Sequence, residues 1–97
     1  MRKIEIQMMN AVYNRKSWQS GNTAVTPNTD ASSTEDGMMV YLHGNHIAYI
    51  HCATGFVLVN KETLRRWSTP TTKSRLRALG VNVSTRKGVT YLNDVAI

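Results

Sequence analysis

The chain is poor in several residue types, and each shortage narrows what the protein can be. Its 97 residues include a single cysteine, Cys52, which excludes an intramolecular disulfide. Nothing in it resembles a secretory signal, so we expect a reducing cytoplasm as its location. No apolar run approaches the roughly 20 residues that a membrane-spanning helix needs, so no membrane contact is expected. The length suits a single domain, residues 1–97, with a modest core.

Carboxylates are scarce as well, with six Asp and Glu against twelve Lys and Arg and a net charge of +6. No two acids are placed to work as a pair in general acid–base catalysis, and no glycine-rich phosphate-binding loop is present. Cys52 alternates onto an apolar strand face with Val57, which is typical of an inert buried thiol rather than of a nucleophile. We therefore predict no enzymatic activity and no cofactor.

The candidates for a metal site are His43, His46, His51 and Cys52. In the predicted hairpin, His43 and His46 lie opposite each other across a Gly44–Asn45 turn, but His51 and Cys52 point to different faces. Structural zinc normally takes four ligands with compact, paired spacing. We therefore predict no metal site and interpret these residues as polar groups near a hairpin end.

The N-terminal third divides into a helix and a polar segment. Residues 2–16 are predicted to be helical, because apolar residues recur at helical spacing and the basic pair Arg15–Lys16 suits a helix C-terminus. Residues 19–37 are rich in Ser, Thr, Asn, Gly and Asp, which predicts a flexible polar loop with a short extended piece around residues 23–26.

A β-meander is predicted next, with strands at 39–43, 46–50 and 56–59. Pairing His43 with His46 would place four apolar or aromatic side chains on one face: Val40, Leu42, Ile47 and Tyr49. The middle strand is apolar on both sides, so it should be central in the sheet, with a packed layer on each face.

The C-terminal third has the clearest helix signals. Thr69 as N-cap, Pro70 at the first position and Gly80 past the end bracket a helix over 70–79. Residues 61–67 predict one or two helical turns. A last hairpin, 81–85 and 89–92, turns around Arg86-Lys87-Gly88 with four residues on its inner face: Val81, Val83, Val89 and Tyr91.

Together these elements predict an α+β fold: a small antiparallel sheet, in the order α-β-β-β-α-β-β, with an N-terminal helix and a second helix packed on it. The predicted core consists of Trp18, Leu42, Ile47, Phe56, Leu64, Trp67, Leu76, Leu79 and Val83.

Positive charge is concentrated in one part of the chain. Eight of the twelve Lys and Arg lie between Lys61 and Lys87, with Glu62 as the one acid there, and residues 17–60 contain no Lys or Arg. This polarity predicts a basic face that binds a polyanion. The candidate binding residues are Arg65, Arg66, Lys73, Arg75, Arg77, Arg86 and Lys87.

Each of these residues also has a simpler interpretation. On the 70–79 helix, Lys73 and Arg77 share one flank while Arg75 lies on the other, so the three do not form a recognition stripe, and a solvated helix surface explains them equally. A helix-turn-helix is excluded because its three-helix core is missing.

Two further groups leave alternatives open. Trp67, beside Arg65 and Arg66, suits base stacking, although a Trp closing a helix onto a small sheet is more often core. Arg86 and Lys87 at a hairpin tip are either phosphate contacts or loop charges.

Three runs of sequence carry a resemblance to known proteins: IEIQMMNAVYNRKSWQSGNTAV, VYLHGNHIAYI and LRRWSTPTTKSRLRALGV. They resemble a group of small proteins of tailed bacteriophages that share an LHGN hairpin and a WxTxTTKxRL helix motif. The resemblance covers most of the chain except residues 27–37, and Pro70 departs from it, standing where an apolar residue is expected. It implies a viral origin and expression in the cytoplasm of a bacterial host, but no mechanism.

The sequence therefore predicts a small phage-encoded accessory protein that binds nucleic acid, DNA or RNA, through a basic face at residues 61–87. The alternative is a non-enzymatic binder or inhibitor of a host protein that docks the same face on an acidic surface. Either function is compatible with a homo-oligomer.

Overall fold

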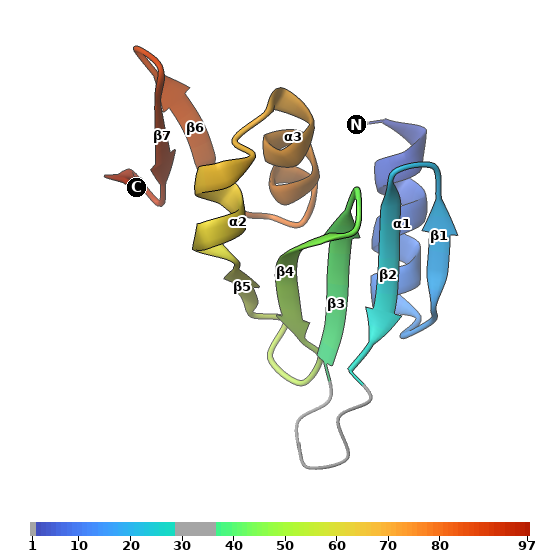
Figure 1. Ribbon diagram of the computed structural model, residues 1–97. Coiled ribbons are helices and arrows are strands. Elements are labelled where there is room, and N and C mark those ends of the chain that lie inside the picture. Colours follow the sequence, from blue (N-terminus) through green and yellow to red (C-terminus); the bar gives the residue numbers. More distant parts are fainter. Residues whose placement is uncertain (1, 29–36) are drawn as a thin grey trace.

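The computed structural model describes residues 2–28 and 37–97. Within them, helices and strands follow one another as an α+β fold (Figure 1). The elements are α1 (Lys3–Tyr13), β1 (Trp18–Ser20), β2 (Thr23–Pro27), β3 (Gly37–Leu42), β4 (Asn45–His51), β5 (Val57–Val59), α2 (Lys61–Arg66), α3 (Pro70–Ala78), β6 (Val83–Arg86), β7 (Val89–Leu92) and β8 (Val95–Ala96). The predicted fold class is confirmed.

The larger sheet is an antiparallel meander in the order β1-β2-β3-β4-β5. Figure 1 shows α1 running behind β2 on one side of this sheet. The three helices contribute Met8, Leu64 and Leu76 to a single core that also contains Val25 and Val40 from the sheet. The opposite face of the sheet keeps its side chains partly exposed, so the predicted second packed layer is absent from the described part of the chain.

The segment predicted as a flexible polar loop is largely ordered where it is described. β1 and β2 pair with each other, and β2 pairs with β3 along its whole length. Thr23 and Val25 of β2 are fully buried, because alternate residues of the strand point into the core. The loop prediction was therefore wrong for residues 19–27, apart from the extended piece around 23–26; residues 29–36 lie outside the described part.

Both predicted hairpins are present, but their turns differ from the prediction. The turns are His43–Gly44 and Lys87–Gly88, and all four of these residues have positive φ, as a type I′ turn requires. The glycine takes the second central position of each turn rather than the first or third position expected from the sequence. Consequently His43 and His46 do not lie opposite each other.

The register changes which side chains share a face. A bulge at Val40/Tyr41 pairs Val40 with Ala48 and Met39 with Tyr49, so Tyr49 lies on the face opposite to Val40. The prediction that these two residues share a face was wrong, because one extra residue in a strand reverses the alternation.

The C-terminal strands form a second sheet, in the order β6-β7-β8, instead of extending the first. Val83 pairs with Leu92, and both are buried, whereas Val89 is exposed. The predicted inner face was therefore wrong for Val89 and for Tyr91, which lies on the same side as Val89. Phe56, which directly precedes β5, is exposed as well, so it does not belong to the core.

The helix boundaries follow local signals. α1 ends at Tyr13, earlier than predicted, because Arg15 adopts a left-handed conformation (φ 54°) and the Lys16 N–H donates back to the Ala11 carbonyl. α3 begins at Pro70, as predicted, and ends one residue early at Ala78. Its N-cap Thr69 accepts a hydrogen bond from the Thr72 N–H at 3.2 Å.

Candidate nucleic-acid interface

The seven basic residues predicted to bind a polyanion divide into two groups. Lys73 and Arg75 are buried, with exposed fractions of 7% and 3%. The other five are exposed and lie on α2, α3 and the β6–β7 hairpin: Arg65, Arg66, Arg77, Arg86 and Lys87. The structure therefore keeps five of the seven residues at the surface.

Arg75 belongs to a buried polar network that joins α3, α1 and β2. Its Nη1 donates to Glu5 Oε2 at 2.8 Å, and its Nε donates to Thr23 Oγ1 at 3.1 Å. The Ser74 hydroxyl donates to the same carboxylate oxygen at 2.6 Å, and the Arg2 backbone N–H donates to Glu5 Oε1. These contacts explain the burial of Arg75, and the prediction that it contacts a partner is corrected.

The network also determines the protonation of Glu5. Burial by itself raises the pKa of a carboxyl group, but hydrogen bonds from Ser74 and Arg75 outweigh it, and the pKa of Glu5 lies below its ordinary value. Glu5 is therefore a carboxylate at neutral pH and neutralises Arg75. Its place on the apolar stripe of α1, three residues before the fully buried Met8, was the sequence signal for a buried partner.

Lys73 is held by the C-terminal sheet. Its ammonium group donates to the Thr85 hydroxyl of β6, so the side chain bridges α3 and β6. Because the residue is buried and hydrogen-bonded, we assign it a structural role, and its predicted role as a surface contact is corrected as well.

The exposed arginines remain accessible although most of them have neighbours. Arg66 lies over the Trp67 ring, 5.7 Å from its centroid, and Arg86 lies over Tyr91 at 5.1 Å. The ion pair between Arg86 and Asp94 spans 3.3 Å between two largely exposed side chains, so it is weak and easily exchanged. Arg77 donates its Nε to the Val83 carbonyl at 2.9 Å, which leaves the other N–H groups of its guanidinium for a partner.

Charge on the described surface is strongly unbalanced. Every Lys and Arg other than Lys73 and Arg75 is exposed: Arg2, Lys3, Arg15, Lys16, Lys61, Arg65, Arg66, Arg77, Arg86 and Lys87. Among the described residues, only Glu62 and Asp94 place a carboxylate at the surface. The described surface is therefore positive even after the buried cations are set aside, and the remaining three acids, Asp30, Glu35 and Asp36, lie outside the described residues.

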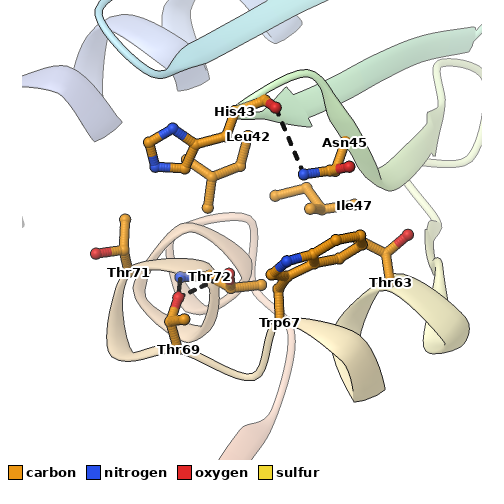
Figure 2. Close-up of a pocket in the computed structure, with 9 residues that line it drawn as sticks. All are labelled: Leu42, His43, Asn45, Ile47, Thr63, Trp67, Thr69, Thr71 and Thr72. Atoms are coloured by element: carbon orange, nitrogen blue, oxygen red, sulfur yellow. Dashed lines mark hydrogen bonds between the residues drawn. The ribbon is translucent and has the colours of Figure 1, made fainter.

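A pocket of about 320 Å³ opens next to Trp67, the residue that Arg66 contacts (Figure 2). It lies between the β3–β4 turn, α2 and the first turn of α3, and it is lined by Leu42, His43, Asn45, Ile47, Thr63, Trp67, Thr69, Thr71 and Thr72. Trp67 was predicted to be core, but it is 42% exposed and forms one wall of the pocket. No signal in the sequence indicated this pocket, because Asn45 and Trp67, which are 22 residues apart, meet there only in the folded chain.

His46 fixes the neighbouring part of the sheet to α2. The Asn60 side chain accepts from the Thr63 N–H, and its amide nitrogen lies 3.3 Å from His46 Nδ1. Burial lowers the pKa of His46, and the nearby backbone of Ala48 opposes this only in part. His46 is therefore neutral at pH 7 and does not add to the positive surface.

Among residues 2–28 and 37–97, no three His, Cys, Asp or Glu side chains gather as metal ligands would. None of the helices α1 to α3 has the length and apolar character needed to cross a bilayer.

The fold and the surface define a small basic α+β protein with exposed arginines and a pocket that Trp67 helps to line. By its sequence the chain belongs to the Kyanoviridae Gp96 protein family, a family of bacteriophage proteins, whose profile matches residues 1–96. No curated protein and no solved structure matches the chain.

Proposed function

We propose that this phage protein binds nucleic acid without sequence specificity through Arg65, Arg66, Arg77, Arg86 and Lys87. The observation that carries the proposal is the excess of exposed positive charge: ten Lys and Arg are exposed, whereas the whole chain has six Asp and Glu, of which Glu5 is buried. A polyanion releases condensed counterions when such side chains neutralise its phosphates, and this release drives sequence-independent binding.

The exposed arginine–aromatic pairs add to this support. Arg66 with Trp67 and Arg86 with Tyr91 each place a guanidinium beside a ring that is not fully buried. Phosphate contacts from arginine combined with stacking on aromatic rings are the means by which many proteins hold nucleic acid without reading its sequence.

The proposal includes a non-enzymatic role in the cytoplasm of the bacterial host. Cys52, the one cysteine, packs against the hydrophobic core, which suits a structural thiol better than a nucleophile. Binding through distributed phosphate contacts needs no catalytic group and no cofactor.

The test is the salt dependence of binding to a fluorescently labelled duplex, followed by anisotropy. If all five cations contact phosphates, log K should fall with log salt concentration at a slope of about −4.5 for duplex DNA. Binding that is absent at low ionic strength, or that does not change with salt, would exclude the proposal.

An acidic host protein is the alternative partner for the same surface. Affinity capture from nuclease-treated bacterial lysate separates the two, because a stoichiometric protein partner that survives nuclease would replace nucleic acid as the ligand. Competition between that partner and duplex DNA would show whether both use the same arginines.

A further inference from the structure

The pocket beside Trp67 has the composition of a site for a planar, uncharged group. Leu42, Ile47 and the Trp67 indole supply apolar walls, and His43, Asn45 and the threonines supply polar ones. Figure 2 shows these side chains arranged around a common space, with His43 and Thr71 on one side and Trp67 and Thr63 on the other. Ligand sites combine apolar walls with polar groups that fix the orientation of the ligand.

Two exposed polar groups at this pocket are open to water or to a ligand. Among the described residues, neither the indole N–H of Trp67 nor the imidazole of His43 has a hydrogen-bond partner within the protein. Asn45 donates only a long hydrogen bond, 3.4 Å, to the His43 carbonyl. A bound ring with donors and acceptors on its edge would find complementary groups here.

The charges around the pocket restrict the chemical class of its ligand further. Among the described residues that line it there is no Asp, Glu, Lys or Arg, so these residues offer no counter-charge to an ionic ring. Arg66 lies directly beside it, over the Trp67 ring, and exposed Arg65 is its chain neighbour. This arrangement suits a neutral ring that is attached to an anionic backbone.

We propose that this pocket holds one unstacked base of a single-stranded nucleic acid, with Arg65 and Arg66 on the adjoining phosphates. The proposal rests on the function proposed above and specifies its substrate. A volume of about 320 Å³ lies at the lower end of ligand sites, which suits one ring system rather than a longer segment. Paired and stacked bases of a duplex cannot reach the pocket, so single strands are preferred.

The experiment uses the fluorescence of Trp67. Trp18→Phe leaves Trp67 as the only tryptophan of the chain. This protein is titrated with an oligothymidylate of about 12 nucleotides, with an abasic strand of the same length and with a duplex. We expect quenching by the base-bearing strand alone, while the abasic strand binds weakly and with a similar salt slope.

Variants then separate the pocket from the charges. Trp67→Ala should weaken binding of the base-bearing strand by about 5- to 150-fold, without a change for the abasic strand. Thr71→Phe, which fills the pocket and keeps the indole, should cause a similar loss. Tyr13→Ala is the matched control, because it removes another exposed aromatic ring that lies on α1, away from the pocket. Thermal melts confirm that each variant is folded.

The outcomes distinguish the two proposals. If abasic and base-bearing strands bind equally and Trp67 is not quenched, the pocket proposal is overturned and nucleic-acid binding stands. If no strand binds at low salt, both proposals fail. If thymidine monophosphate quenches Trp67 as strongly as the oligomer does, the occupant is a free nucleotide and the pocket proposal is likewise overturned.

Discussion

Arg75 and Arg66 are the same residue type on neighbouring helices, yet they serve opposite purposes. Arg75 is 3% exposed and joins Glu5 and Thr23 in the interior, whereas Arg66 is exposed and touches only an aromatic ring among the contacts described above. The interior region uses its charge to hold α1, β2 and α3 together, and the surface region leaves its charge available to a partner. Charge density along a sequence thus overstates the charge that a surface presents.

The two regions also differ in the energy of their contacts. Breaking a buried ion pair leaves an uncompensated charge in a medium that solvates it poorly, whereas an exposed pair such as Arg86–Asp94 exchanges readily with water and salt. Substitutions in the interior should therefore change stability, and substitutions on the surface should change binding.

The largest effect is expected from Arg75→Met. It leaves the Glu5 carboxylate buried without its cation, and the free energy of unfolding should fall by about 3–5 kcal/mol, measured by urea denaturation. The double variant Glu5→Met/Arg75→Met removes both charges and should be more stable than Arg75→Met alone. A double variant as unstable as the sum of the two single variants would show that the pair is not coupled.

Leu76→Ala tests the apolar side of the same helix. Leu76 is fully buried in the core, and its truncation should lower the free energy of unfolding by about 2–5 kcal/mol through lost burial and a residual cavity. Leu58→Ala is the control, because Leu58 is 54% exposed on β5, and a change within about 0.5 kcal/mol is expected. Equal losses in the two variants would contradict the packing of α3.

The pH dependence of stability should report on Glu5. Its pKa in the folded protein lies below the ordinary value of 4.5, so the folded state favours the ionised form. The resulting stabilisation is complete above pH 4.5 and is lost as the pH falls through the folded-state pKa. The melting temperature of the wild type should fall with pH over this acid range more steeply than that of Glu5→Gln. If the two melting temperatures fall in parallel, the loss of stability comes from other carboxylates.

The smallest effect on stability is expected from the surface pair of substitutions, Arg65→Gln/Arg66→Gln. Both side chains are exposed, so the melting temperature should not change, while the salt slope for duplex binding should become shallower by about 2. Lys16→Gln, an exposed cation outside the proposed interface, should leave the slope nearly unchanged. If both variants change the salt slope equally, the interface is not confined to the proposed residues and extends over the whole surface.

The sequence predicted the local elements better than their partners. Thr69 and Pro70 marked the start of α3 correctly, because an N-cap and a fixed φ act within a few residues. The hairpin turns were predicted at the wrong residues, because His43 and Lys87 adopt positive φ, which their own side chains do not favour. The pairing of the strands supplies the twist that selects these turns.

The candidate site was predictable only in part. Its exposed arginines follow from composition and position, but the burial of Lys73 and Arg75 depends on Thr85 and Glu5, which lie 12 and 70 residues away in the chain. The pocket at Trp67 likewise needs the β3–β4 turn against α3.

By itself the sequence determined the excess of positive charge, the helix signals and the α+β class, because these depend on composition and on contacts between near neighbours. The tertiary structure alone decided which cations are buried and which remain at the surface. That choice depends on desolvation, and a buried charge is tolerated only where the fold brings a partner such as Glu5 within hydrogen-bonding distance.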